Sequence, residues 1–142
     1  DNLRLQLVNT THGLFDTLMP GGRVTIEPPA LNPIGIDHIM VSVTNVERSA
    51  AHYRKLFGPE TSRDRNPDRV WFKLADSKLG LETVASGQKP GFSHYCVKVA
   101  GFDRAAATAK LAKLGLRVEA GSENGTLRFR DLHNLPVEVV AG

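Results

Sequence analysis

The sequence of 142 residues has few of the features that mark secreted, membrane-spanning or nucleic-acid-binding proteins. Its single cysteine, Cys96, excludes an internal disulfide and agrees with a reducing compartment, so we expect a cytoplasmic location. The sequence has no run near the roughly 18 apolar residues that a transmembrane helix needs. Aromatic residues make up only 6%, the net charge is +3 and no Lys/Arg cluster occurs, so we expect no binding to nucleic acid.

A repeat organises most of the chain. Shifted by 56 residues, "IDHIMVSVTNVERSAA" (36–51) aligns with "FSHYCVKVAGFDRAAA" (92–107), and "LGLETVA" (79–85) aligns with "LPVEVVA" (135–141). Because one ungapped offset matches both ends of each copy, we interpret the chain as two similar modules.

Each copy reads as a strand, a helix and then three short strands. Asn45 is a suitable N-cap for a helix that ends at Gly58, and a second helix is expected from about 102 to 114. Its apolar stripe is expected to comprise Phe102, Ala106 and Ala109. The strands are predicted near 36–43, 60–64, 70–75, 79–85, 92–99, 117–120, 126–131 and 135–140. This order predicts an α+β fold in which two tandem βαβββ modules form a curved mixed sheet with the helices on the outside.

The modules are expected at 34–89 and 90–142, within one domain that spans 34–142. Residues 10–33 are rich in Gly and Pro and indicate a linker. The segment "NLRLQLV" within 1–9 resembles "NLPVEVV" at the end of the second copy. We therefore expect residues 1–9 to be the last strand of a preceding module in a longer protein.

Alternation along the strands separates two faces of the sheet. The apolar series should contact the helices, and the other series should line a concave face. Two histidines and two glutamates that the repeat matches fall in this second series: His38, Glu82, His94 and Glu138. Such a set can hold a divalent cation such as Zn, Ni, Co, Mn or Fe(II). A buried polar network without a metal is the alternative.

The motifs "IDHIMVSV", "LGLETV", "FSHYCVKV" and "FRDLHNLPVEVV" resemble those of the vicinal oxygen chelate superfamily, which includes glyoxalase I, methylmalonyl-CoA epimerase, extradiol dioxygenases and bleomycin resistance proteins. The resemblance covers residues 34–142 and implies metal ligands on the first and last strand of each module. Carried over by position, these ligands are His38, Glu82, His94 and Glu138. The resemblance also implies a possible homodimer, and it leaves open whether the site forms within one chain or between two.

The resemblance implies isomerase, epimerase or lyase chemistry through a metal-stabilised enolate. In this hypothesis Glu82 or Glu138 takes the proton. One alternative is an Fe(II) extradiol-type dioxygenase that uses His38, His94 and Glu138, with Glu82 away from the metal. Another is a small-molecule-binding module without catalysis.

Further residues of the concave series suggest a small anionic substrate, because their side chains are cationic or offer a flat apolar wall. They are Trp71, Lys73, Lys98, Arg128 and Arg130. Cys96 is interpreted as a packing residue, and His133 as a solvated residue of a turn.

Overall fold

The computed structural model describes residues 29–122 and 125–142. The strand expected at 1–9 and the linker expected at 10–33, apart from its last residues, lie outside the described part of the chain. These two expectations therefore stay predictions.

The described residues form two βαβββ modules in the predicted order. The first comprises β1 (Pro33–Val43), α1 (Val46–Phe57), β2 (Ser62–Arg65), β3 (Asp68–Leu74) and β4 (Ser77–Thr83). The second comprises β5 (Gly91–Val99), α2 (Arg104–Lys113), β6 (Glu119–Ala120), β7 (Leu127–Arg130) and β8 (Pro136–Ala141). Every strand and helix expected between residues 36 and 140 is thereby confirmed.

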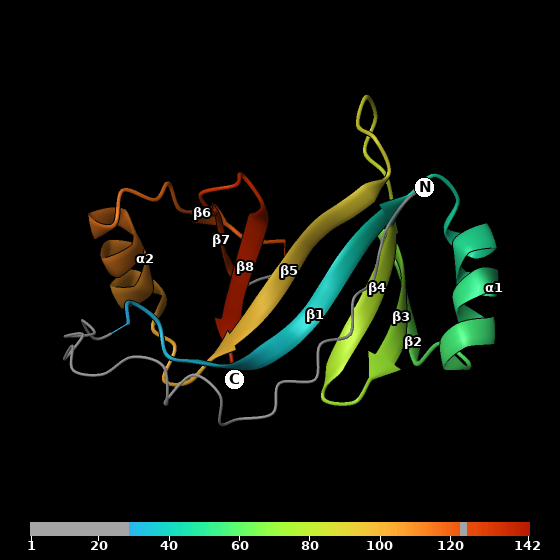
Figure 1. Ribbon diagram of the computed structural model, residues 1–142, viewed down its shortest axis with the longest axis horizontal. Helices are drawn as coiled ribbons and strands as arrows, with labels where there is room; N and C mark the ends of the chain where they lie inside the picture. Colours follow the sequence, from blue (N-terminus) through green and yellow to red (C-terminus); the bar gives the residue numbers. More distant parts are fainter. Residues whose placement is uncertain (1–28, 123–124) are drawn as a thin grey trace, which may run out of the picture.

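All the strands belong to one mixed sheet in the order β2-β3-β4-β1-β5-β8-β7-β6. The first strands of the two modules, β1 and β5, pair antiparallel at the centre, and each is flanked by the parallel last strand of its own module. Figure 1 shows the sheet curving between α1 at one end and α2 at the other. The α+β fold with a curved mixed sheet is confirmed.

The first module builds its core on the predicted apolar series. Asn45 caps α1 as expected, because its side chain accepts a hydrogen bond from the backbone N–H of Arg48 at 2.8 Å. The helix packs on β3 and β4 and buries Ala50 completely. The sheet contributes side chains such as Val41, Phe72 and Leu81 to the same cluster.

The buried face of α2 differs from the prediction. Ala107 and Leu111 are the buried residues of this helix, whereas Ala106 and Ala109 are exposed. Alanines occur all around this helix, so their spacing does not define a face, and the larger side chain of Leu111 determines which side is buried.

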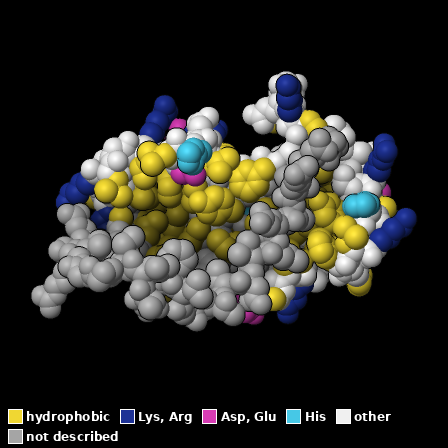
Figure 2. Space-filling view, in the orientation of Figure 1, with side chains coloured by type: hydrophobic (Ala, Val, Ile, Leu, Met, Phe, Trp, Pro, Cys, Tyr) yellow, Lys and Arg dark blue, Asp and Glu magenta, His cyan; other side chains and the backbone are white. Residues whose placement is uncertain are grey.

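Apolar groups stay exposed on the described part of the chain. Ile36 on β1 and Leu135, just before β8, are 39% and 43% exposed. Figure 2 shows hydrophobic side chains gathered over the β5 and β8 half of the sheet and toward α2. Among the described helices, neither has the length and apolar character needed to cross a membrane.

Candidate metal centre

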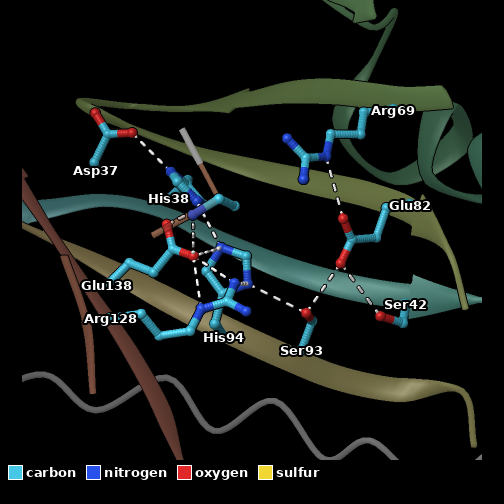
Figure 3. Close-up of polar contacts among 10 residues, drawn as sticks. Asp37, His38, Ser42, Arg69, Glu82, Ser93, His94, Arg128 and Glu138 are labelled. Carbon is cyan, nitrogen blue, oxygen red and sulfur yellow. Dashed lines mark hydrogen bonds and ion pairs between the residues drawn. The ribbon is translucent and has the colours of Figure 1, made fainter. Parts of the chain in front are cut away.

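Two histidines and one glutamate converge at the centre of the sheet. His38 stands on β1, His94 on β5 and Glu138 on β8. One ligand atom from each lies within 4.8 Å of the others. The two Nε2 atoms are 3.1 Å apart, and Oε1 of Glu138 lies 3.9 Å from Nε2 of His94 (Figure 3). All three side chains come from one chain, so this cluster needs no second copy.

The three residues are almost completely buried, with at most 3% of each exposed. Two imidazole nitrogens and a carboxylate oxygen are the donors that Zn²⁺ and Fe(II) bind in proteins, and a site with three protein ligands leaves positions for a substrate. The donor set therefore fits a divalent cation.

Glu138 is held as a charged carboxylate. The backbone N–H and the hydroxyl of Ser122 donate to its two oxygens at 3.0 and 2.9 Å, and Nε of Arg128 donates to Oε1 at 2.8 Å. Burial raises the pKa of Glu138, but the neighbouring His94, these hydrogen bonds and the Arg128 charge outweigh burial and lower it. An ionised carboxylate is the form that binds a metal.

His94 favours its neutral form. Burial lowers its pKa to about 4, although the charge of Glu138 acts in the opposite direction. A neutral imidazole has a free lone pair, so at pH 7 a metal would not have to displace a proton from the imidazolium.

Each histidine ring has a polar side chain next to its Nδ1 atom. Oδ2 of Asp37 is 2.8 Å from Nδ1 of His38, and Oγ of Ser93 is 3.2 Å from Nδ1 of His94. Burial raises the pKa of Asp37, but the hydrogen bond to His38 and the charge of Lys78 lower it further than burial raises it, so Asp37 is ionised at neutral pH.

Glu82 lies outside this cluster, although it shares the predicted face. Its carboxylate accepts hydrogen bonds from Ser93 at 3.0 Å, from Ser42 at 3.4 Å and from Nε of Arg69 at 3.1 Å. The repeat therefore predicted the face of Glu82 correctly, but the structure does not bring it to the other three donors.

Strand register explains the position of Glu82. In the second module Glu138 pairs with Cys96, which lies two residues after His94. The matching residue of the first module, Met40, lies two residues after His38 and pairs with Gly80. Glu82 is displaced along β4 by two residues, which preserves its face and changes its distance from the cluster.

Gly80 also closes the position that a fourth ligand would need. A Cβ atom on Gly80 would lie 2.7 Å from Cε of Met40 and 2.7 Å from Cζ3 of Trp71. Both of these side chains are buried, so they fill the space beside the cluster. The structure thus assembles three of the four predicted ligands.

The predicted substrate residues differ in their distance from the cluster. Trp71 lies edge-on to the His38 ring with 5.2 Å between centroids, and Arg128 contacts Glu138. Lys98 donates to the Asp76 carbonyl and lies 3.7 Å from Asp37. The remaining two, Lys73 and Arg130, are exposed, and Arg130 donates to the Asn134 carbonyl in a turn.

Sequence reasoning missed Asp37, Ser93 and Ser122. A signal for the first two existed, because they precede the matched histidines at the same 56-residue offset. Ser122 gave no such signal. His133 is an exposed turn residue, as expected, and its N–H donates to Asp131.

Comparison with solved structures shows proteins of the same architecture. Methylmalonyl-CoA epimerase from Mycobacterium tuberculosis superposes with a TM-score of 0.63 and 14% identity, over 82% of this chain and 93% of the epimerase. The 2,3-dioxygenase LapB from Pseudomonas sp. KL28 superposes with a TM-score of 0.61 and 26% identity, over 80% of this chain and 42% of the dioxygenase. Homoprotocatechuate 2,3-dioxygenase from Arthrobacter globiformis superposes with a TM-score of 0.62 and 21% identity, over 80% of this chain and 37% of that dioxygenase.

The chain spans nearly the whole epimerase but less than half of either dioxygenase. No protein-family model and no curated protein matches the sequence. The solved neighbours are enzymes, in agreement with the enzyme predicted from the sequence. Their architecture and the repeat agree with the motif resemblance, and the chain has the fold of the vicinal oxygen chelate superfamily.

Proposed function

We propose that this protein is a divalent-metal-dependent enzyme that acts on a small anionic substrate. The observation that carries the proposal is the buried cluster of His38, His94 and Glu138, whose ligand atoms lie within 4.8 Å of one another. A divalent cation held there would polarise a substrate oxygen and stabilise the negative charge that develops when the adjacent carbon loses a proton.

The protein's own residues would supply the base and the anion site for isomerase, epimerase or lyase chemistry. Glu82 is half-buried on the concave face and is not one of the three clustered donors, so we assign it as the base rather than as a ligand. Glu138 is less suited to proton transfer, because it is one of the three clustered donors and is completely buried. Arg128 donates to Glu138 within the cluster and would pair with a substrate carboxylate or phosphate.

An Fe(II) extradiol-type dioxygenase is the second candidate. Two histidines and one carboxylate with open positions form the ligand set of many non-haem Fe(II) oxygenases. Gly80, at the position of a fourth ligand, favours such a three-ligand site. The third possibility, a binding module without catalysis, predicts stoichiometric ligand uptake without turnover.

Metal binding tests the proposal first. Purified protein should take up one equivalent of Zn²⁺, Mn²⁺, Co²⁺, Ni²⁺ or Fe²⁺ by elemental analysis after dialysis, and His94→Ala should take up none. Wild-type protein that stays free of metal after exposure to all five ions would contradict it.

Two assays on the metal-loaded protein then separate the chemistries. Methylmalonyl-CoA, the ligand of one solved epimerase, is incubated in D₂O, and exchange of its C–H proton is followed by NMR. A catechol is incubated with the Fe(II) form, and oxygen uptake is measured. Proton exchange that Glu82→Gln abolishes supports enolate chemistry, whereas oxygen uptake that survives this substitution supports the dioxygenase.

The cytoplasmic location and the homodimer stay predictions from the sequence. Size-exclusion chromatography with light scattering tests the second of them.

A further inference from the structure

Each clustered histidine follows an extra residue in the central strand pair. In the β1–β5 ladder His38 pairs with Cys96, but Ile36 pairs with Val97, so Asp37 has no opposite residue. An unpaired residue of this kind is a β-bulge, and a bulge turns a side chain away from regular alternation. Asp37 can therefore reach the His38 ring on the concave face.

The second bulge repeats the first at the matched position. Met40 pairs with His94, but Val41 pairs with Phe92, so Ser93 is the unpaired residue. The side chain of Ser93 accordingly lies on the same face as His94 and contacts its Nδ1 atom (Figure 3). Two bulges 56 residues apart thus place one polar side chain behind each imidazole.

The partners of these side chains determine which nitrogen of each ring carries hydrogen. An ionised Asp37 only accepts hydrogen bonds, so the 2.8 Å contact requires hydrogen on Nδ1 of His38. Ser93 donates its hydroxyl hydrogen to Glu82 at 3.0 Å, so its oxygen accepts from Nδ1–H of His94. Arg69 holds Glu82 in turn through a 3.1 Å contact.

A competing contact to Nδ1 of His94 is weaker. Nη2 of Arg128 lies 3.5 Å from this atom, farther than Oγ of Ser93, and Arg128 is bound to Glu138. With hydrogen on both Nδ1 atoms, two Nε2 lone pairs face each other across 3.1 Å. This arrangement is electrostatically unfavourable until a cation lies between them.

We propose that Asp37 and Ser93 are positioning residues that fix His38 and His94 with hydrogen on Nδ1 and direct both Nε2 lone pairs to one metal ion, with Glu82 orienting the Ser93 hydroxyl. The inference rests on the proposed metal site and assigns to these residues a role in building it. Outer hydrogen bonds of this type fix ring orientation and raise ligand basicity, and their loss typically weakens metal binding about 10- to 100-fold.

The chain offers a matched control for Ser93. Ser42 also donates to Oε1 of Glu82, at 3.4 Å, so this hydroxyl contacts the carboxylate rather than a histidine. Ser42→Ala therefore removes a hydroxyl from the same carboxylate without removing one from an imidazole.

Titration of the metal-free protein with Zn²⁺ alone tests the affinities. Ser93→Ala and Asp37→Ala should weaken binding at least about 10-fold, Ser93→Thr should restore it, and Ser42→Ala should stay within about twofold of wild type. Equal affinities for wild type, Ser93→Ala and Asp37→Ala would overturn this inference while the proposed function stands. Wild-type protein that binds no Zn²⁺ would overturn both.

NMR of the ¹⁵N-labelled Zn²⁺ form gives a readout that general destabilisation would not reproduce. Ser93→Ala should shift the Nδ1–H proton of His94 upfield and speed its exchange with water, and leave His38 unchanged. Asp37→Ala should shift the Nδ1–H proton of His38 upfield and speed its exchange with water, and leave His94 unchanged. Shifts of both histidines in each variant would overturn the separate assignments.

Discussion

His38 and His94 stand 56 residues apart in the chain, and their Nε2 atoms lie 3.1 Å from each other. The antiparallel pairing of β1 with β5 creates this proximity, because it places the first strands of both modules side by side. Glu138 approaches from the parallel strand beside β5. The site is therefore asymmetric: two histidines come from matched positions, but the carboxylate comes from one module.

This asymmetry predicts different effects for the two repeat-matched glutamates. Glu138→Gln should lose its metal on dialysis, because it replaces a charged carboxylate ligand by a neutral amide. Glu82→Gln should keep one equivalent of metal, since the amide oxygen still accepts from Ser93. Elemental analysis after dialysis measures both. Loss of metal from Glu82→Gln and its retention by Glu138→Gln would show that the ligands are assigned the wrong way round.

Gly80→Ala should destabilise the fold. The added methyl group would approach the buried Met40 and Trp71 to 2.7 Å, and overpacking of this kind typically costs about 1–3 kcal/mol. Urea denaturation measures the free energy of unfolding. Gly35→Ala, on β1, is the control because its Cβ would have no neighbour within 4 Å, and we expect a change within about 0.5 kcal/mol.

Arg128→Gln should tighten metal binding. Arg128 donates to Oε1 of Glu138, the oxygen nearest His94, so a metal must compete with its positive charge. We expect affinity for Zn²⁺ to rise about tenfold by calorimetry. Arg130→Gln, two residues along β7, should leave it unchanged, since Arg130 donates to the Asn134 carbonyl. A weaker affinity in Arg128→Gln would instead mean that Arg128 mainly orients the carboxylate.

The metal-free protein should lose stability in mild acid. The pKa of His94 is about 4 in the folded protein and near 6.5 in the unfolded chain, so between these values the unfolded chain binds more protons. The free energy of unfolding should therefore fall as the pH falls from 6.5 to 4, by on the order of 2 kcal/mol. Denaturation in the presence of a chelator measures this, and His94→Asn should flatten the dependence.

Replacing the exposed His133 with Asn is the control for this measurement, and it should leave the pH dependence as in wild type. A metal-free wild-type protein with constant stability from pH 6.5 to 4 would contradict the lowered pKa of His94.

Much of the fold was predictable because its signals are local. Strand alternation, the Asn45 cap and the repeat placed the strands and helices, and they assigned the histidines and glutamates to one face. The prediction of which side of α2 is buried was wrong, because alanines occur on all sides of this helix. The sequence by itself therefore determined the architecture and which residues share the concave face.

Only the tertiary structure determined how far along its strand each of these residues lies on that face. A shift of two residues between parallel strands preserves alternation, so Glu82 and Glu138 look equivalent in the sequence although only Glu138 reaches the histidines. The bulges at Asp37 and Ser93 likewise depend on the partner strand, because an extra residue exists only relative to the strand it pairs with. Register and bulges are properties of strand pairs, and pairing is fixed only when the whole sheet assembles.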